Sequence, residues 1–179
     1  MNIEQKLINE IRDVHDFPIK GIVFKDITPI MMNPVLSKEV LEELKMQVKQ
    51  LGITKIAGVE SRGFLFGYPL AMELGLPFVL IRKKGKLPYH KVSHAYQLEY
   101  GSAEIEMHVD AVEKGDRVLI HDDLLATGGS ASAAGELIIG NGAEVAGFSF
   151  LVILDFLNGV KTGSNYLNRD WLFGEDLIF

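Results

Sequence analysis

The chain alternates between stretches with the hydrophobic period of a helix and stretches with the character of strands. Near the N-terminus, apolar residues recur at helical spacing from residue 3 to residue 14, which predicts an amphipathic helix that stops at Asp16-Phe17-Pro18. A second helix is expected to begin near Ser37, a suitable N-cap, and to end at Gly52. Residues 20–29 between them show no helical period, and turn formers at both ends predict a loop or a short extended piece.

From residue 53 onward, strand patterns and helix patterns follow one another. Strands are predicted at residues 53–59, 78–82, 117–121 and 145–154, and helices at residues 63–74 and 130–139. The last strand is almost continuously apolar, as expected for a strand covered on both faces. Residues 83–109 are expected to form a flexible basic loop followed by a β-hairpin arm. The pattern predicts an α/β fold with a mainly parallel central sheet flanked by helices, and we expect residues 1–179 to form one domain.

Composition and charge exclude several classes of function. With 47% hydrophobic and 23% charged residues, the chain has the composition of a globular protein. Its formal net charge of −6 argues against general nucleic-acid binding, so any anion site must be local. The absence of cysteine excludes disulfides, thiolate metal sites and cysteine nucleophiles. Early charged residues argue against a signal peptide, and the longest apolar stretch is too short to span a membrane, so a cytoplasmic protein is expected.

The strongest chemical signal is the segment of residues 117–131. A predicted strand brings Asp122 and Asp123 to its carboxyl end, where ligands of parallel sheets bind. A turn of small residues then opens a helix, whose N-terminal N–H groups and partial positive charge suit a phosphate. The candidate phosphate-binding residues of this turn are Ala126, Thr127, Gly128, Gly129 and Ser130. Since the two carboxylates suit the vicinal hydroxyls of a ribose, the segment predicts a sugar-phosphate site.

A second anion site is predicted at Ser61-Arg62-Gly63, which follows a strand and leads into a helix. Its single guanidinium suits a pyrophosphate, although a helix-capping turn with a solvated arginine is the alternative. Four cations lie at the end of the predicted strand of residues 78–82 and just after it: Arg82, Lys83, Lys84 and Lys86. A basic loop of this kind could close over a pyrophosphate leaving group, or it could be an ordinary solvated charge run.

These motifs resemble the type I phosphoribosyltransferase family, whose binding motif for phosphoribosyl pyrophosphate is an apolar strand, two acids and a small-residue loop. The string Asp122-Asp123-Leu124-Leu125-Ala126-Thr127-Gly128-Gly129-Ser130 is similar to the form found in the adenine-specific members. Three further segments are similar to the same family: residues 16–29, residues 60–64 and Leu98-Glu99-Tyr100-Gly101. The departures are His121, where an aliphatic residue is usual, Lys25, where arginine is usual, and an atypical loop at residues 89–94.

The resemblance implies roles that the spacing of residues does not. It implies a small hood from residues 16–30, with Phe24 and Leu124 on the two faces of a purine and with Lys25 among the substrate-binding residues. It implies a non-proline cis peptide in the turn that carries Arg62, which would lie beside the base as well as the pyrophosphate. Glu99 and Arg62 would be the catalytic residues, and Tyr100 would lie over the active site. In this interpretation Ser61, Arg82, Lys83 and Lys86 bind the pyrophosphate.

The reaction that follows from the resemblance is transfer of the phosphoribosyl group from phosphoribosyl pyrophosphate to adenine, a step of purine salvage. Mg²⁺ would arrive with the pyrophosphate rather than in a protein cage, and the histidines offer no metal constellation, since His90 and His94 have no third ligand nearby. A homodimer is implied. The alternatives are the same reaction on hypoxanthine, guanine, xanthine or orotate, and a non-catalytic regulator that senses phosphoribosyl pyrophosphate.

Overall fold

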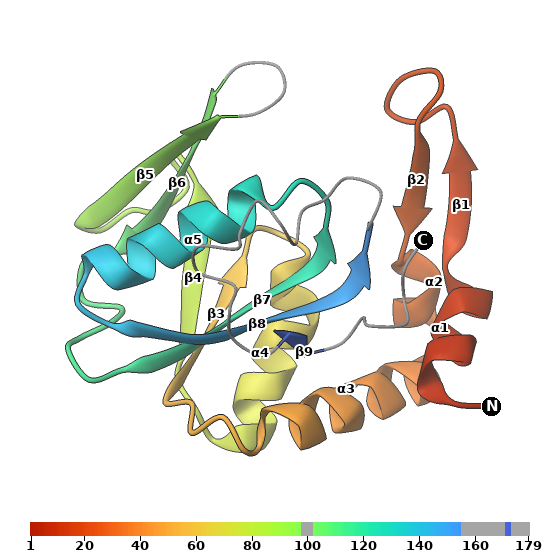
Figure 1. Cartoon of the computed structure of the whole chain (residues 1–179), viewed down its shortest axis with the longest axis horizontal. Helices are drawn as coiled ribbons and strands as arrows, with labels where there is room; N and C mark the ends of the chain where they lie inside the picture. Colours follow the sequence, from red (N-terminus) through yellow and green to blue (C-terminus); the bar gives the residue numbers. More distant parts are fainter. Residues whose placement is uncertain (98–101, 155–170, 173–179) are drawn as a thin grey trace. The chain divides into compact units, whose positions relative to one another are not determined.

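The computed structural model describes residues 1–97 and 102–154 and the backbone of residues 171–172. Its internal contacts divide the chain into two compact units, residues 1–44 and residues 45–179. The two units are described separately below, and Figure 1 shows the elements of each. The expectation that residues 1–179 form one domain stays a prediction.

The first unit begins with helix α1 (Ile3–Glu10), whose N-cap Asn2 accepts a hydrogen bond from the backbone N–H of Gln5 at 2.9 Å. The expected helix was wrong in its last turn, because residues 12–15 form strand β1 (Arg12–His15). This strand pairs antiparallel with β2 (Val23–Asp26), so interstrand hydrogen bonds replace those of a further helical turn. The short helix α2 (Thr28–Met32) follows. The extended piece expected within residues 20–29 is therefore confirmed as β2.

Helix α3 (Pro34–Val48) starts three residues earlier than the sequence indicated. Asn33 provides the cap, since its side-chain oxygen accepts a hydrogen bond from the backbone N–H of Leu36 at 3.1 Å. Ser37, the expected N-cap, instead donates its hydroxyl proton to the carbonyl of Ile30 at 2.8 Å. Proline at the first helical position fits this start, because its missing N–H would have had no partner inside the helix.

The second unit is built on a seven-stranded sheet in the order β5-β6-β4-β3-β7-β8-β9 (Figure 1). The parallel strands are β3 (Lys55–Val59), β4 (Phe78–Lys83), β7 (Arg117–Leu125), β8 (Glu144–Ile153) and β9 (Trp171–Leu172). An antiparallel hairpin of β5 (Lys91–Gln97) and β6 (Ser102–His108) joins the sheet through pairing of β6 with β4. The predicted mainly parallel sheet is confirmed. Strand β9 was not anticipated, because the sequence after residue 155 has weak patterning.

Helices α4 (Gly63–Leu74) and α5 (Gly129–Gly140) cover opposite faces of this sheet. A Cβ atom placed on Gly67 of α4 would lie 3.4 Å from the ring of His121. Ile120, the residue before His121 in β7, belongs to the apolar core that also contains Ala134 of α5. Because successive residues of a strand point to opposite faces, α4 and α5 lie on different sides of β7.

The hairpin arm begins earlier than expected. Residues 91–94, which the sequence suggested to be part of an atypical loop, lie in β5. Two ion pairs connect this region to β6: Lys84, which precedes β5, pairs with Glu104 at 2.6 Å, and Lys91, the first residue of β5, pairs with Glu106 at 3.2 Å. In Figure 1 the green hairpin runs beside α5, which contacts β5. Over the described part of the chain, no helix has the length and apolar character needed to cross a membrane.

Candidate active site

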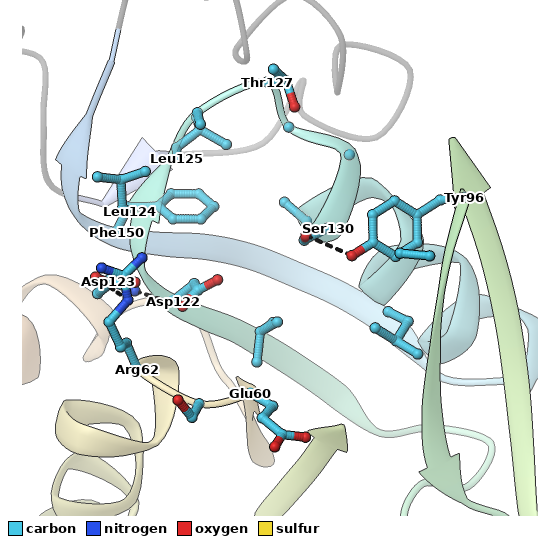
Figure 2. A pocket seen from close by; sticks show the side chains of 18 of the residues that line it. Glu60, Arg62, Tyr96, Asp122, Asp123, Leu124, Leu125, Thr127, Ser130 and Phe150 are labelled. Carbon is cyan, nitrogen blue, oxygen red and sulfur yellow. Dashed lines mark hydrogen bonds and ion pairs between the residues drawn. The ribbon is translucent and has the colours of Figure 1, made fainter. Parts of the chain in front are cut away.

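A cavity of about 490 Å³ lies within the unit of residues 45–179, at the carboxyl ends of β3 and β7 (Figure 2). This volume falls in the range of small-molecule sites. Its lining comprises residues 59–62, Lys83, Tyr96, Ala103, Ile105, residues 122–131 and Phe150. The two anion-binding segments expected from the sequence therefore meet at one cavity, as ligand sites of parallel sheets predict.

The turn of residues 126–128 joins β7 to α5 at the wall of the cavity. Gly128 is the N-cap of α5 and has a φ of +82°, a left-handed conformation that glycine adopts without a steric penalty. The N–H of Ser132 donates the first bond of the helix to the Gly128 carbonyl at 2.9 Å. The N-terminal end of α5 thus faces the cavity, where its backbone N–H groups and partial positive charge favour a phosphate.

Asp122 and Asp123 lie inside strand β7, which continues to Leu125 and is longer than the sequence predicted. Asp122 is half-buried and accepts a hydrogen bond from the Asp123 N–H at 2.9 Å, whereas Asp123 is buried. Burial, and then the neighbouring charge of Asp123, raise the pKa of Asp122 well above its usual range. Burial also raises the pKa of Asp123, against the opposing charge of Arg62. In either protonation state, a carboxyl group can hydrogen-bond to hydroxyl groups of a ligand.

The turn before α4 brings Arg62 to the two acids. Its Nε lies 3.1 Å from Oδ2 of the buried Asp123, as Figure 2 shows. The close approach depends on Gly63, since a Cβ there would lie 2.5 Å from the carbonyl oxygen of His121. The Glu60–Ser61 peptide in this turn is cis, as the resemblance implied. The pairing of Arg62 with Asp123 was not anticipated, because the two residues are far apart in the sequence.

The basic residues at the end of β4 and just after it divide into two groups. Lys83 lines the cavity, whereas Arg82 and Lys86 are not among the described residues that line it. Arg82 binds the carboxylate of Glu60 through Nε at 3.2 Å and Nη2 at 3.1 Å, and its Nη1 donates to the carbonyl of Lys86 at 3.1 Å. Although burial opposes it, hydrogen bonds from Arg82 and from the Lys83 N–H lower the pKa of Glu60.

Besides Arg82 and Lys86, four further expected site residues are not placed at this cavity. Phe24 and Lys25 belong to the unit of residues 1–44, where Phe24 stacks edge-on against Phe17 with ring centroids 5.2 Å apart. In the same unit, Lys25 pairs with Asp13 at 2.7 Å. Glu99 and Tyr100 lie outside the described residues. The roles of all four remain predictions.

Eight residues that line the cavity were not among those predicted from the sequence: Val59, Glu60, Tyr96, Ala103, Ile105, Leu125, Ala131 and Phe150. A signal for Tyr96 was present, because side chains alternate between the two faces of a strand and Tyr96 shares a face with the apolar Val92. Phe150 looked like any other apolar residue of a buried strand. Glu60 was part of a recognised segment, but its pairing with Arg82 depends on the parallel alignment of β3 and β4.

His121, a departure from the family pattern, is fully buried on the α4 side of β7. Its Nδ1 lies 3.1 Å from the hydroxyl of Ser149, and its Nε2 has no hydrogen-bond partner within the described residues. Burial lowers the pKa of His121 from 6.5 to about 4, so the imidazole is neutral at physiological pH. A structural role in packing follows, rather than a role in proton transfer.

This burial predicts a specific dependence of stability on pH. Between pH 6.5 and pH 4, the unfolded chain binds a proton at His121 that the folded chain does not. The contribution of neutral His121 to the free energy of unfolding is complete above this pH window. As the pH falls through the window, this contribution is lost at about 1.4 kcal/mol per pH unit. His121→Leu should remove this slope from the free energy of unfolding, measured by urea denaturation. The exposed His15→Leu is the control, and equal slopes for wild type and His121→Leu would contradict the prediction.

Comparison with known proteins agrees with this geometry. The family described as "Phosphoribosyl transferase domain" matches residues 34–163. The adenine phosphoribosyltransferase of Anaeromyxobacter dehalogenans (strain 2CP-1) is 51% identical over 151 residues, which cover 84% of this chain and 88% of that protein. The chain belongs to the adenine phosphoribosyltransferase family. The family resemblance of the motifs is thereby confirmed.

Solved structures of adenine phosphoribosyltransferases share the fold. The enzyme from Thermoanaerobacter pseudethanolicus has a TM-score of 0.90 at 44% identity, covering 94% of this chain and 98% of that chain. The Saccharomyces cerevisiae enzyme, complexed with an imino-altritol bisphosphate and adenine, has a TM-score of 0.88 at 40% identity, covering 94% and 96%. Since the coverage is nearly complete for both chains, the phosphoribosyltransferase fold predicted from the sequence is confirmed.

Proposed function

We propose that this chain transfers the 5-phosphoribosyl group of phosphoribosyl pyrophosphate to adenine, giving AMP and pyrophosphate with inversion at the anomeric carbon. The observation that carries the proposal is the meeting of three groups at one cavity. These are the N-terminus of α5 at Gly128, the adjacent acids Asp122 and Asp123, and the guanidinium of Arg62. Such a set suits a phosphate, a ribose and a pyrophosphate, and the reaction would serve purine salvage.

Each part of the substrate has a matching part of the cavity. Residues 126–130 would bind the 5′-phosphate, and the carboxyl groups of Asp122 and Asp123 would accept hydrogen bonds from the ribose hydroxyls. Ser61, Arg62 and Lys83 line the cavity beside them and would bind the pyrophosphate. Arg82 and Lys86 would add positive charge from the basic segment. With these contacts, catalysis rests on positioning and on stabilising the leaving group as positive charge develops on the ribose.

The proposed purine site uses an apolar sandwich. Leu124 lines the cavity and would contact one face of the base, and Phe24 would contact the other. Backbone groups of residues 21–25, including Lys25, would bind the purine edge. Adenine in the Saccharomyces cerevisiae structure supports a base site in this family.

Mg²⁺ would enter with phosphoribosyl pyrophosphate. Pyrophosphate oxygens, ribose hydroxyls and water would fill its shell, and the protein would supply no direct ligand, since this cation prefers substrate oxygens to an all-protein cage. Asp122 and Asp123, which line the cavity, would act on the ion only through the ribose hydroxyls that they bind. When bound, the ion would neutralise charge on the leaving group.

Glu99 would act on the chemical step through N7 of the purine, whose charge changes as the glycosidic bond forms. Glu99→Gln should lower kcat by about 10²–10⁴-fold with a much smaller change in KM for adenine, since the interaction strengthens in the transition state. Steady-state kinetics measures both constants, and Glu104→Gln on β6 is the control. Turnover by Glu99→Gln at the wild-type rate would reject the catalytic role.

The direct test is pyrophosphate release from phosphoribosyl pyrophosphate and Mg²⁺, with and without adenine. We expect release that depends on adenine and is accompanied by AMP. Release with hypoxanthine, guanine, xanthine or orotate but not with adenine would favour the alternative base specificities. Binding of phosphoribosyl pyrophosphate without release for any base would favour the non-catalytic sensor.

A cytoplasmic homodimer remains our expectation for the assembly. Dimerisation is supported by an apolar stripe at helical spacing on α4, where Leu65, Tyr68 and Met72 are all exposed. Such a stripe is a feature of surfaces that bind another protein. Analytical sedimentation of the purified chain measures its oligomeric state, and a monomer at micromolar concentration would contradict the expected homodimer.

A further inference from the structure

We propose that Tyr96 is a positioning residue for the 5′-phosphate, acting through the hydroxyl of Ser130. The inference rests on the proposed function, because it assumes that the phosphate binds at the N-terminus of α5. The hydroxyl oxygen of Tyr96 lies 3.0 Å from Oγ of Ser130, and either atom can be the donor. Figure 2 shows the two side chains pointing toward one another across the wall of the cavity.

The position of Tyr96 suits it to hold another group in place. Its ring is half-buried and packs against the apolar core of the sheet and α5. A tyrosine has only two side-chain torsions, so a packed ring fixes the position of its hydroxyl at little entropic cost. Strand β5, which carries it, contacts α5. The hydroxyl is therefore a fixed point beside the phosphate-binding turn.

The hydroxyl of Ser130, in contrast to that of Tyr96, can change its orientation. It is the second residue of α5, in the turn whose backbone N–H groups lack partners inside the helix. A serine hydroxyl can rotate among three staggered positions and carries a single proton. Without a neighbour, only part of its population would point that proton at a bound phosphate. With Tyr96 beside it, one orientation is favoured.

The chemistry of phosphate sets the direction of the hydrogen bond. Oxygens of an ionised phosphate accept hydrogen bonds, so Ser130 must donate its proton to bind one. The oxygen of Ser130 is then an acceptor, and Tyr96 must donate to it. The result is a chain from the Tyr96 hydroxyl through the Ser130 hydroxyl to the phosphate, in which each bond strengthens the next. Tyr96 need not touch the substrate itself.

The test compares ligands with and without the phosphate. Tyr96→Phe keeps the packed ring and removes the hydroxyl. Loss of one ordering hydrogen bond should weaken AMP binding about threefold to tenfold, measured by calorimetric titration. Adenosine, which lacks the phosphate, should bind to the variant with the same affinity as to the wild type. The KM of the variant for phosphoribosyl pyrophosphate should rise, with little change in kcat. Tyr68→Phe, at an exposed tyrosine on α4, is the matched control and should leave AMP affinity unchanged.

A double-mutant cycle separates this inference from the proposed function. Ser130→Ala should weaken AMP binding, and adding Tyr96→Phe to it should have no further effect, because the chain is already broken. If Ser130→Ala weakens binding but Tyr96→Phe does not, or if the two effects add, the positioning role is overturned and the phosphate site stands. If wild type fails to bind AMP, or Ser130→Ala binds it normally, the proposed phosphate site is overturned as well. Equal weakening of AMP and adenosine by Tyr96→Phe would also overturn the inference.

Discussion

Replacing Gly128 by valine should abolish AMP binding while the chain still folds. Gly128 has a φ of +82° at the N-cap of α5 and lines the cavity. A valine side chain disfavours this left-handed conformation and would also occupy space beside the backbone N–H groups that we assign to the 5′-phosphate. Each lost hydrogen bond to a charged group costs about 1.5–3 kcal/mol, so losing two predicts a fall in AMP affinity of at least about a hundredfold.

The control for backbone strain lies just beyond the other end of the same helix. Gly142 has a φ of +86°, and a Cβ placed there would meet nothing within 4 Å. Gly142→Val should therefore carry a similar conformational cost, about 1–2 kcal/mol of stability, without affecting the cavity. Calorimetric titration with AMP compares the two variants, and thermal unfolding checks that both fold. Unchanged AMP affinity in folded Gly128→Val would reject the phosphate assignment.

Adenine should be preferred over hypoxanthine by about 10²–10⁴ in kcat/KM, since two polar contacts are reversed between the bases. Adenine offers a donor at N6 and an acceptor at N1, whereas hypoxanthine offers an acceptor at O6 and a donor at N1. Backbone groups of residues 21–25 that fit adenine would leave both hypoxanthine positions unpaired. Each buried unpaired group costs about 1–3 kcal/mol, which gives this range. Guanine should fail for the same reason, and its 2-amino group adds a steric conflict.

The measurement is kcat/KM for adenine, hypoxanthine and guanine with saturating phosphoribosyl pyrophosphate and Mg²⁺. Phe24→Ala should lower kcat/KM for adenine, since it removes the ring proposed to cover one face of the base. Phe17→Ala is a useful companion variant, because Phe17 contacts Phe24 edge-on and would act only through it. Use of hypoxanthine or guanine within tenfold of adenine would contradict adenine specificity and would leave the phosphoribosyl transfer intact.

Much of the sheet-forming unit could be predicted because its signals are local. The bounds of α4 were predicted to the residue, since Gly75 with a φ of +65° ends the helix where the apolar pattern ends. The strand, acid pair and small-residue turn of residues 117–130 are contiguous, so their order along the chain alone indicated a sugar-phosphate site. The family resemblance came from the same contiguous segments.

The misplaced elements are those in which a distant partner outweighs local preference. Residues 12–15 fit the helical spacing of α1, but pairing with residues 23–26 makes them a strand. Ser37 is a good cap by residue type, yet Asn33 provides the cap because its side chain reaches the N–H of Leu36. Local propensities amount to a few tenths of a kcal/mol per residue, and a set of interstrand hydrogen bonds exceeds that.

By itself, the sequence determined the α/β class, the small-residue turn before α5 and the two acids beside it, because each is encoded in a run of neighbouring residues. Only the tertiary structure decided which side chains meet. Arg62 pairs with Asp123, Arg82 pairs with Glu60, and Tyr96 reaches Ser130. The physical reason is that the parallel sheet aligns the carboxyl ends of β3 and β7, and the hairpin lies against α5, so the site joins residues far apart along the chain.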